Sequence, residues 1–118
     1  MALVKHWREL IAWQKAHQLV IEIYKITKLF PKDELYALIS QIRRAAISIT
    51  ANIAEGFFRN TKPDRLHFYN MAETSLEEVK YYIILAKDLN YLSIEKSREV
   101  YALCNEVGKL LRRWIESQ

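Results

Sequence analysis

Apolar residues recur every three or four positions through most of this chain, and the pattern is interrupted at only a few places. Residues spaced in this way share one face of an α-helix. The pattern predicts four helices: one from Arg8 or Glu9 to Lys28 or Leu29, one from Asp33–Glu34 to about Phe57, one opening after Thr61 and stopping near Asn90–Tyr91, and one following Ser93.

Each interruption carries a recognised helix start or stop signal. Pro31 disfavours helical geometry in the residue before it, and Gly56 followed by Asn60–Pro63 is the clearest turn signal in the chain. Thr61 with Asp64 three residues later predicts a cap for the third helix, and Ser93 predicts one for the fourth. Short connections between four such helices predict an all-α, antiparallel up-down-up-down four-helix bundle.

One face of each helix is expected to line the bundle core. These faces are Leu10, Trp13, His17, Val20, Tyr24 and Thr27 in the first helix; Leu35, Ile39, Ile42, Ala46, Ile49, Ile53 and Phe57 in the second; Phe68, Ala72, Ser75, Val79, Tyr82, Ala86 and Leu89 in the third; and Ile94, Ser97, Tyr101, Cys104, Gly108, Leu111 and Ile115 in the fourth.

Two helices carry a further apolar face, which the core of a single bundle would not require. In the second helix it includes Tyr36 and Ser40, and in the fourth it includes Val100 and Val107. Exposure of such apolar faces to water is unfavourable, so they predict contact with another subunit. The predicted interface residues are Tyr36, Ile47, Ala51, Ala54, Phe58, Leu103, Leu110 and Trp114.

The second helix also carries a polar stripe, formed by Gln41, Arg44, Ser48, Asn52, Glu55 and Arg59. Three interpretations are open. The stripe is a solvated face; or its members, one turn apart, satisfy one another across a subunit interface or pore; or its arginines bind phosphates, which guanidinium groups contact in a bidentate manner. Tyr81, Tyr82 and Tyr91 could stack on bases, although aromatic residues at helical spacing usually belong to a core or an interface.

Composition narrows the class of protein. A chain of 118 residues is predicted to form one domain, residues 1–118, and only two glycines and two prolines are too few for the turns of an all-β fold. One cysteine allows no internal disulfide, and charged residues interrupt every apolar run, so we expect a cytoplasmic protein that does not cross a membrane. The formal charge of +4 and pI near 9.2 favour anionic partners.

No catalytic or cofactor-binding pattern stands out, and we expect no enzyme activity and no cofactor. His6, His17 and His67 lack the spacing of a helical zinc site. Asp64 and His67 have the carboxylate-x-x-His spacing of di-iron bundles, but that chemistry requires two such motifs. We therefore expect no metal site, and we expect Cys104 to be a small core residue.

Several segments together resemble a known family. They are Leu10–Ala16 (LIAWQKA), Phe30–Pro31 followed by Glu34, Gln41–Gly56 (QIRRAAISITANIAEG) and Ala72–Glu78 (AETSLEE). These resemble the bacterial four-helix bundle proteins encoded in intervening sequences of 23S ribosomal RNA genes, although Thr74 stands where that family's pattern has glycine. The resemblance covers nearly the whole chain. It implies the bundle fold and a ring-like homo-oligomer, a pentamer, but no biochemical activity.

Proteins of a similar fold serve as accessory proteins of diversity-generating retroelements, alongside a reverse transcriptase and nucleic acid. By this analogy and from its charge, the chain is expected to bind structured RNA or DNA through basic side chains. The predicted contacts are Arg43, Arg44, Arg59, Lys62 and Arg65. The alternative is a protein-binding adaptor or scaffold whose basic charge is incidental.

Overall fold

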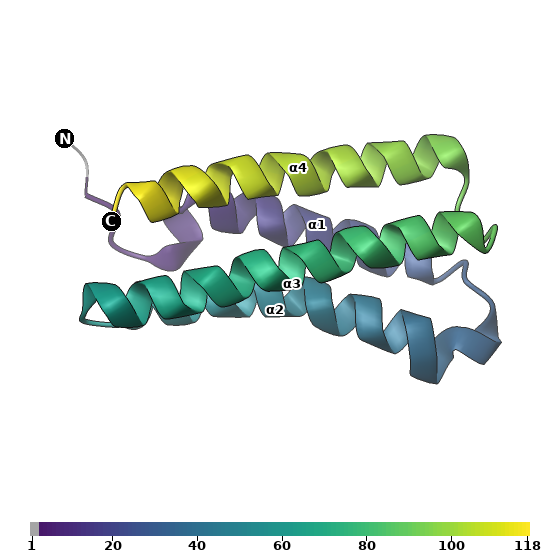
Figure 1. Ribbon diagram of the computed structural model, residues 1–118, viewed down its shortest axis with the longest axis horizontal. Coiled ribbons are helices and arrows are strands. Elements are labelled where there is room, and N and C mark those ends of the chain that lie inside the picture. Colours follow the sequence, from purple (N-terminus) through teal and green to yellow (C-terminus); the bar gives the residue numbers. More distant parts are fainter. Residues whose placement is uncertain (1–2) are drawn as a thin grey trace.

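The computed structural model describes residues 3–118 and confirms the all-α prediction (Figure 1). Its main helices are α1 (Ile11–Thr27), α2 (Ser40–Phe58), α3 (Lys62–Asp88) and α4 (Ile94–Glu116), and residues 3–118 include no strand. The molecule is elongated, with principal extents of 46 × 25 × 18 Å. None of the helices in the described part of the chain is long and apolar enough to cross a membrane.

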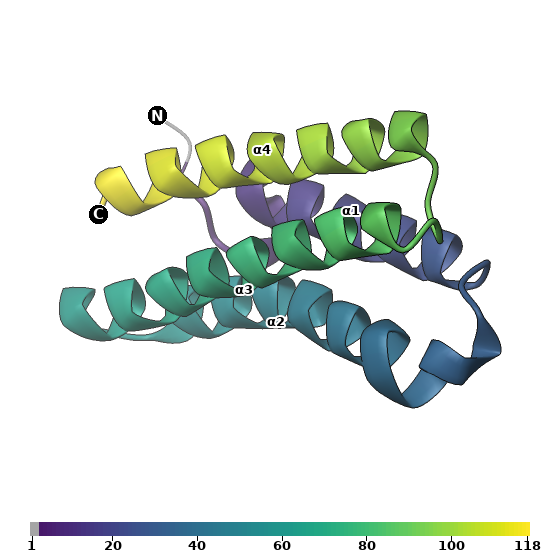
Figure 2. The same ribbon diagram turned by 45° about the vertical axis from the view of Figure 1, so that its right-hand side comes forward.

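The four helices form an antiparallel bundle in which each helix packs against two others. α2 contacts α1 and α3, α4 also contacts α1 and α3, and the α2–α3 contact is the most extensive. The α3–α4 pair therefore lies across the bundle from the α1–α2 pair. The start of α1, the C-terminus and the α2–α3 turn lie at one end, and the other two connections lie at the opposite end (Figures 1 and 2).

The segment before α1 contains a short helical turn that packs against the core. Trp7–Glu9 form the 3-10 turn η1, which His6 caps by accepting a hydrogen bond from the Arg8 backbone N–H. Trp7 packs against the core, and its ring lies 4.8 Å from that of Trp13. The α-helix itself therefore begins at Ile11, two or three residues later than predicted.

The buried face of α1 is rotated from the predicted one. Leu10, Val20 and Thr27 are buried as expected, but His17 and Tyr24 are exposed and Trp13 is only half-buried. Part of this face is formed by the small residues Ala12 and Ala16, which allow neighbouring helices to approach closely. The buried residues within α1 are Ala12, Ala16, Leu19, Val20, Ile23, Ile26 and Thr27.

The second helix begins with two turns of other helical types. Lys32–Glu34 form the 3-10 turn η2 and Leu35–Ile39 form the π-helical turn η3, so the regular α-helix begins only at Ser40. Glu34 anchors this region by accepting a hydrogen bond from the Tyr91 hydroxyl at 2.9 Å. Leu35 was predicted to face the core, but it is 46% exposed because it lies in the π-helical turn η3 and not in the regular α-helix.

The predicted caps of α3 and α4 and the predicted end of α3 are confirmed by their hydrogen bonds. Thr61 accepts from the Asp64 N–H at 3.3 Å, and Ser93 accepts from the Lys96 N–H at 3.1 Å. At the end of α3, Asn90 adopts a left-handed conformation with φ of 64°. The Asn90 and Tyr91 N–H groups donate to the carbonyls of Lys87 and Ala86, the Schellman pattern that ends a helix.

The α3 face includes three large residues that the predicted seam omitted. Tyr69, Leu76 and Ile83 are buried beside the correctly predicted Ala72, Ser75, Val79 and Ala86, while Leu89 is exposed. The fully buried Tyr69 ring lies directly over Gly56 of α2, and a Cβ at position 56 would be 2.5 Å from Tyr69 Cε1. Gly56 therefore lies within α2 and permits close packing there, rather than ending the helix.

Candidate functional site

The five basic residues predicted to bind nucleic acid do not form one cluster. Arg59, Lys62 and Arg65 surround the α2–α3 turn, whereas Arg43 and Arg44 lie four turns earlier on α2, about 22 Å away along the helix axis. Arg43 therefore does not lie with the turn residues. Arg44 is exposed but equally distant from the turn.

Arg43 is instead part of the contact between α1 and α2. Its Nε donates to Thr27 Oγ1 at 2.9 Å, and its guanidinium carbon lies 4.4 Å from the centre of the Tyr24 ring. A cation held over an aromatic ring and bonded to a buried hydroxyl is stabilised in that position. This geometry gives Arg43 a structural role at the edge of the core.

The turn residues are more available to solvent. Lys62 is exposed, and Arg59 forms a 3.0 Å ion pair with Glu55 while its guanidinium lies over the Phe68 ring. Arg65 donates from Nε to Gln118 Oε1 at 3.2 Å and from Nη1 to the Asn60 carbonyl. The Arg65–Gln118 bond places the C-terminus beside the start of α3.

The fold brings further cations to this end of the bundle. Arg113, in the last turn of α4, lines a hollow together with Val4 and Glu9 of the N-terminal segment. Arg113 is not among the contacts predicted from the sequence, although the dipeptide Arg112–Arg113 near the C-terminus is a visible signal. We call Arg59, Lys62, Arg65 and Arg113 the basic end.

The middle of the polar stripe on α2 is used inside the bundle. Asn52 is 8% exposed, and its Nδ2 donates to the carbonyl and the hydroxyl of Ser48. The Ser75 hydroxyl of α3 donates to Ser48 Oγ at 2.9 Å. At these positions the stripe therefore belongs to the α2–α3 contact, an arrangement that none of the three interpretations anticipated. Gln41, Arg44, Glu55 and Arg59 remain exposed.

The additional apolar face of α2 is exposed in the single chain, as its prediction as an interface requires. Tyr36 is 92% exposed, Phe58 79% and Ile47 43%. Ala51 is also exposed, and Ala54 is half-buried. Large apolar side chains exposed along one helix are typical of a surface that another molecule covers.

The second apolar seam of α4, unlike that of α2, is used by the core of the single chain. Val100 and Val107, on its second apolar seam, are buried in the chain's own core. Leu103 and Trp114 are half-buried and pack against that core, and Leu110 is half-buried in the hollow beside Leu10. The premise that the core does not need this seam is therefore wrong. A role for Leu103, Leu110 and Trp114 in a subunit interface stays a prediction without that support.

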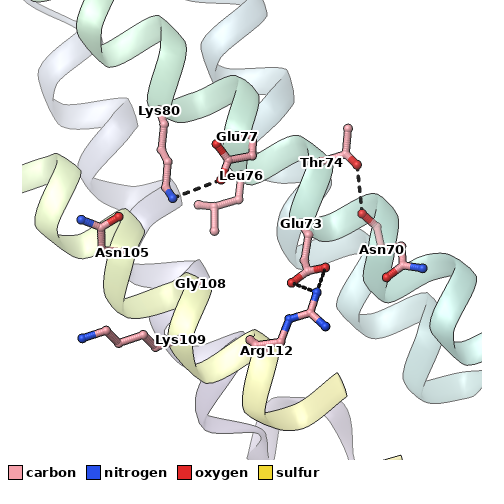
Figure 3. A pocket seen from close by; sticks show the side chains of 10 residues that line it. All are labelled: Asn70, Glu73, Thr74, Leu76, Glu77, Lys80, Asn105, Gly108, Lys109 and Arg112. Atoms are coloured by element: carbon pink, nitrogen blue, oxygen red, sulfur yellow. Dashed lines mark hydrogen bonds and ion pairs between the residues drawn. The ribbon is translucent and has the colours of Figure 1, made fainter. Parts of the chain in front are cut away.

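A groove of about 760 Å³ lies between α3 and α4 (Figure 3). Arg112 donates from Nη2 to both carboxylate oxygens of Glu73, at 2.6 and 2.7 Å, across the groove. Lys80 pairs with Glu77 at 3.1 Å along α3. The other lining residues are Asn70, Thr74, Leu76, Asn105, Gly108 and Lys109.

The remaining candidate reactive group is Cys104, which is completely buried. Burial raises the pKa of its thiol to about 12, so the thiolate is absent at neutral pH. This confirms Cys104 as a core residue. Among residues 3–118, no three His, Cys, Asp or Glu side chains lie close enough together to hold a metal ion.

We expect native Cys104 to resist alkylation by iodoacetamide at pH 8, because the reaction needs both access and the thiolate. In denaturant the same thiol should react at the rate of an ordinary exposed cysteine. Mass spectrometry after timed exposure measures both rates. Rapid modification of the native protein at pH 8 would show that α4 opens locally or that the thiol is accessible.

The fold and its surfaces define a small antiparallel four-helix bundle with an exposed apolar face, a basic end and a polar groove. The chain belongs to the 23S rRNA-intervening sequence protein family, whose model matches residues 8–113. This confirms the resemblance noted in the sequence. No protein of curated function matches the chain.

A solved structure supports the fold. The chain is similar to a protein of unknown function from the S23 ribosomal protein family of Bacteroides thetaiotaomicron VPI-5482, with 23% sequence identity and a TM-score of 0.83. The similarity covers 90% of this chain and 96% of the other. At this identity the likeness establishes the architecture alone.

Proposed function

We propose that this protein is a non-enzymatic, ring-like homo-oligomer that binds structured RNA or DNA through basic side chains. The main support is the basic end, where the α2–α3 turn and the end of α4 bring Arg59, Lys62, Arg65 and Arg113 to the same end of the bundle. Arginine and lysine at exposed positions contact phosphates without reading the base sequence.

Self-association is supported by a separate feature, the exposed apolar face of α2. Tyr36, Ile47 and Phe58 would be removed from water by a neighbouring copy, and each further copy would add its formal charge of +4 to the same particle. The family resemblance implies that this assembly is a pentamer. An adaptor that binds another protein through the same apolar face is the alternative.

The proposal predicts how charge-removing substitutions change binding. Lys62→Gln together with Arg113→Gln should weaken binding to unrelated RNA and DNA sequences alike. Removing one phosphate contact should reduce the slope of log affinity against log salt by about 0.7 to 0.9. Titrations at several salt concentrations with fluorescently labelled oligonucleotides measure this slope.

A matched control removes two exposed lysines from the opposite end of the bundle, Lys28→Gln with Lys32→Gln. The two double variants have the same net charge, so a general effect of charge would change both slopes equally. The basic end is the binding surface only if its variant shows the larger reduction. Equal slopes for the two variants would exclude it.

A further inference from the structure

The α3–α4 groove contains a glycine that the bundle itself does not require. Gly108 lies within α4, where glycine costs roughly 1 kcal/mol relative to alanine. A Cβ at this position would lie 3.4 Å from Leu76 Cδ2, an ordinary packing distance. The contrast with Gly56 is clear, because there the same atom would collide with Tyr69.

Gly108 of α4 lines the groove, and small or amide side chains continue along the same helix. Ala102 and Asn105 line the adjoining hollow of about 250 Å³, and Asn105 borders both depressions. The absence of a side chain at position 108 exposes the helix backbone to the groove. A bound chain could therefore approach α4 more closely here than at a position with a Cβ.

The charges around the groove are predominantly positive. The two depressions are lined by five basic side chains, Lys80, Lys87, Arg98, Lys109 and Arg112, and by two acidic ones, Glu73 and Glu77. Both acidic groups are held in ion pairs, with Arg112 and Lys80 respectively. Arg98 and Lys109 have no ion pair within residues 3–118. Lys109 is exposed, and its side chain extends from the outer edge of α4, on the side away from α3 (Figure 3).

The length and position of the groove agree with a nucleic-acid backbone as its occupant. Arg98 and Arg112 are about 21 Å apart along α4, the axial length of about six nucleotides of one strand. Arg112, at the end of the groove nearest the C-terminus, precedes Arg113 of the basic end in the sequence, so the groove reaches the same end of the bundle. The groove also lies on the α3–α4 side, across the bundle from the α1–α2 pair.

Resting on the proposed function, we infer that the α3–α4 groove holds a segment of the nucleic-acid sugar-phosphate backbone. Lys109 and Arg98 contact phosphates, and Gly108 allows the strand to lie close to α4. Arg112 is a positioning residue, because its bidentate pair with Glu73 fixes the two groove walls relative to each other.

Two substitutions test the groove without disturbing the core. Gly108→Ala adds one methyl group, so the thermal unfolding midpoint should stay the same or rise, while affinity for labelled RNA and DNA oligonucleotides should fall about tenfold, as expected when one close approach is blocked. Lys109→Gln should leave the fold intact and reduce the salt slope by about 0.7 to 0.9. Lys25→Gln, on α1 away from the groove, is the charge-matched control and should bind like the native protein.

The possible failures are distinguishable. If Gly108→Ala and Lys109→Gln bind like the native protein while the Lys62→Gln and Arg113→Gln variant is weakened, the groove assignment is wrong and the proposed function stands. If the native protein binds neither nucleic acid at low salt, the proposed function itself falls. If polyglutamate of matched charge binds as tightly and loses affinity in Gly108→Ala, the groove takes an acidic polypeptide instead.

Discussion

Replacing Gly56 with alanine should lower the free energy of unfolding by about 3 kcal/mol, the upper end of the range for overpacked cores. The new Cβ would lie 2.5 Å from Cε1 and 2.8 Å from Cδ1 of Tyr69, and that ring is completely buried. Neither α2 nor α3 can move away easily, because this helix pair makes the most extensive contact in the bundle. Urea unfolding followed by circular dichroism measures the change.

Gly108→Ala is the matched control, since it makes the same chemical change within another helix. Its Cβ has room, so the free energy of unfolding should rise by up to about 1 kcal/mol through helix propensity. Trimming the obstructing ring in a Gly56→Ala and Tyr69→Leu double variant should recover part of the stability. Similar effects of the two glycine substitutions would show that the Tyr69 contact is not what requires Gly56.

The second large effect is expected from Ile47→Asp, which should convert the proposed oligomer into monomers. Ile47 is 43% exposed in the single chain, so a carboxylate there costs the isolated bundle little. If another subunit covers this position, the same carboxylate would be buried without a partner, at a cost of several kcal/mol. Light scattering coupled to size-exclusion chromatography gives the mass.

Ile84→Asp provides the comparison, because Ile84 is 40% exposed but lies on α3 beside the hollow between α3 and α4. This variant should keep the native mass. If both variants keep that mass, the α2 face is not the subunit interface. If Ile84→Asp alone dissociates the particle, the interface lies on the α3–α4 side and the groove cannot be free for nucleic acid.

The sequence was most informative about where helices begin and end. Thr61, Ser93 and Asn90 act through hydrogen bonds to residues within four positions of them, and such local chemistry is visible in the sequence. The π-helical turn at Leu35–Ile39 was not predicted. It coincides with a contact between Glu34 and Tyr91, residues that only the folded chain brings together.

The orientation of each helix was less predictable than its length. In α1, the predicted core face was chosen from large side chains such as Trp13 and Tyr24. In the structure, the small residues Ala12 and Ala16 are buried and Tyr24 is exposed. Aromatic side chains with polar atoms often lie at the edge of a core, where one end stays in contact with water. A pattern based on hydrophobicity alone cannot distinguish these positions.

The candidate binding surface was predicted only in part, because it depends on contacts between distant segments. Lys62 lies within the turn signal at Asn60–Pro63 and Arg65 follows it, so both were predicted from the sequence as contacts. Arg43 lies next to Arg44 in the sequence but is held by Tyr24 and Thr27 of another helix. Arg113 and the groove around Gly108 join the surface only through the antiparallel packing of α3 and α4.

The central claim is that an assembled particle binds nucleic acid through its basic surface. The most direct test is to measure the affinity of the native protein for RNA and for DNA at two ionic strengths, with the mass of the bound species determined in parallel. We expect binding by the oligomer at low salt, with log affinity falling steeply as log salt rises. Failure to retain either nucleic acid at low salt, or an affinity independent of salt, would contradict the claim.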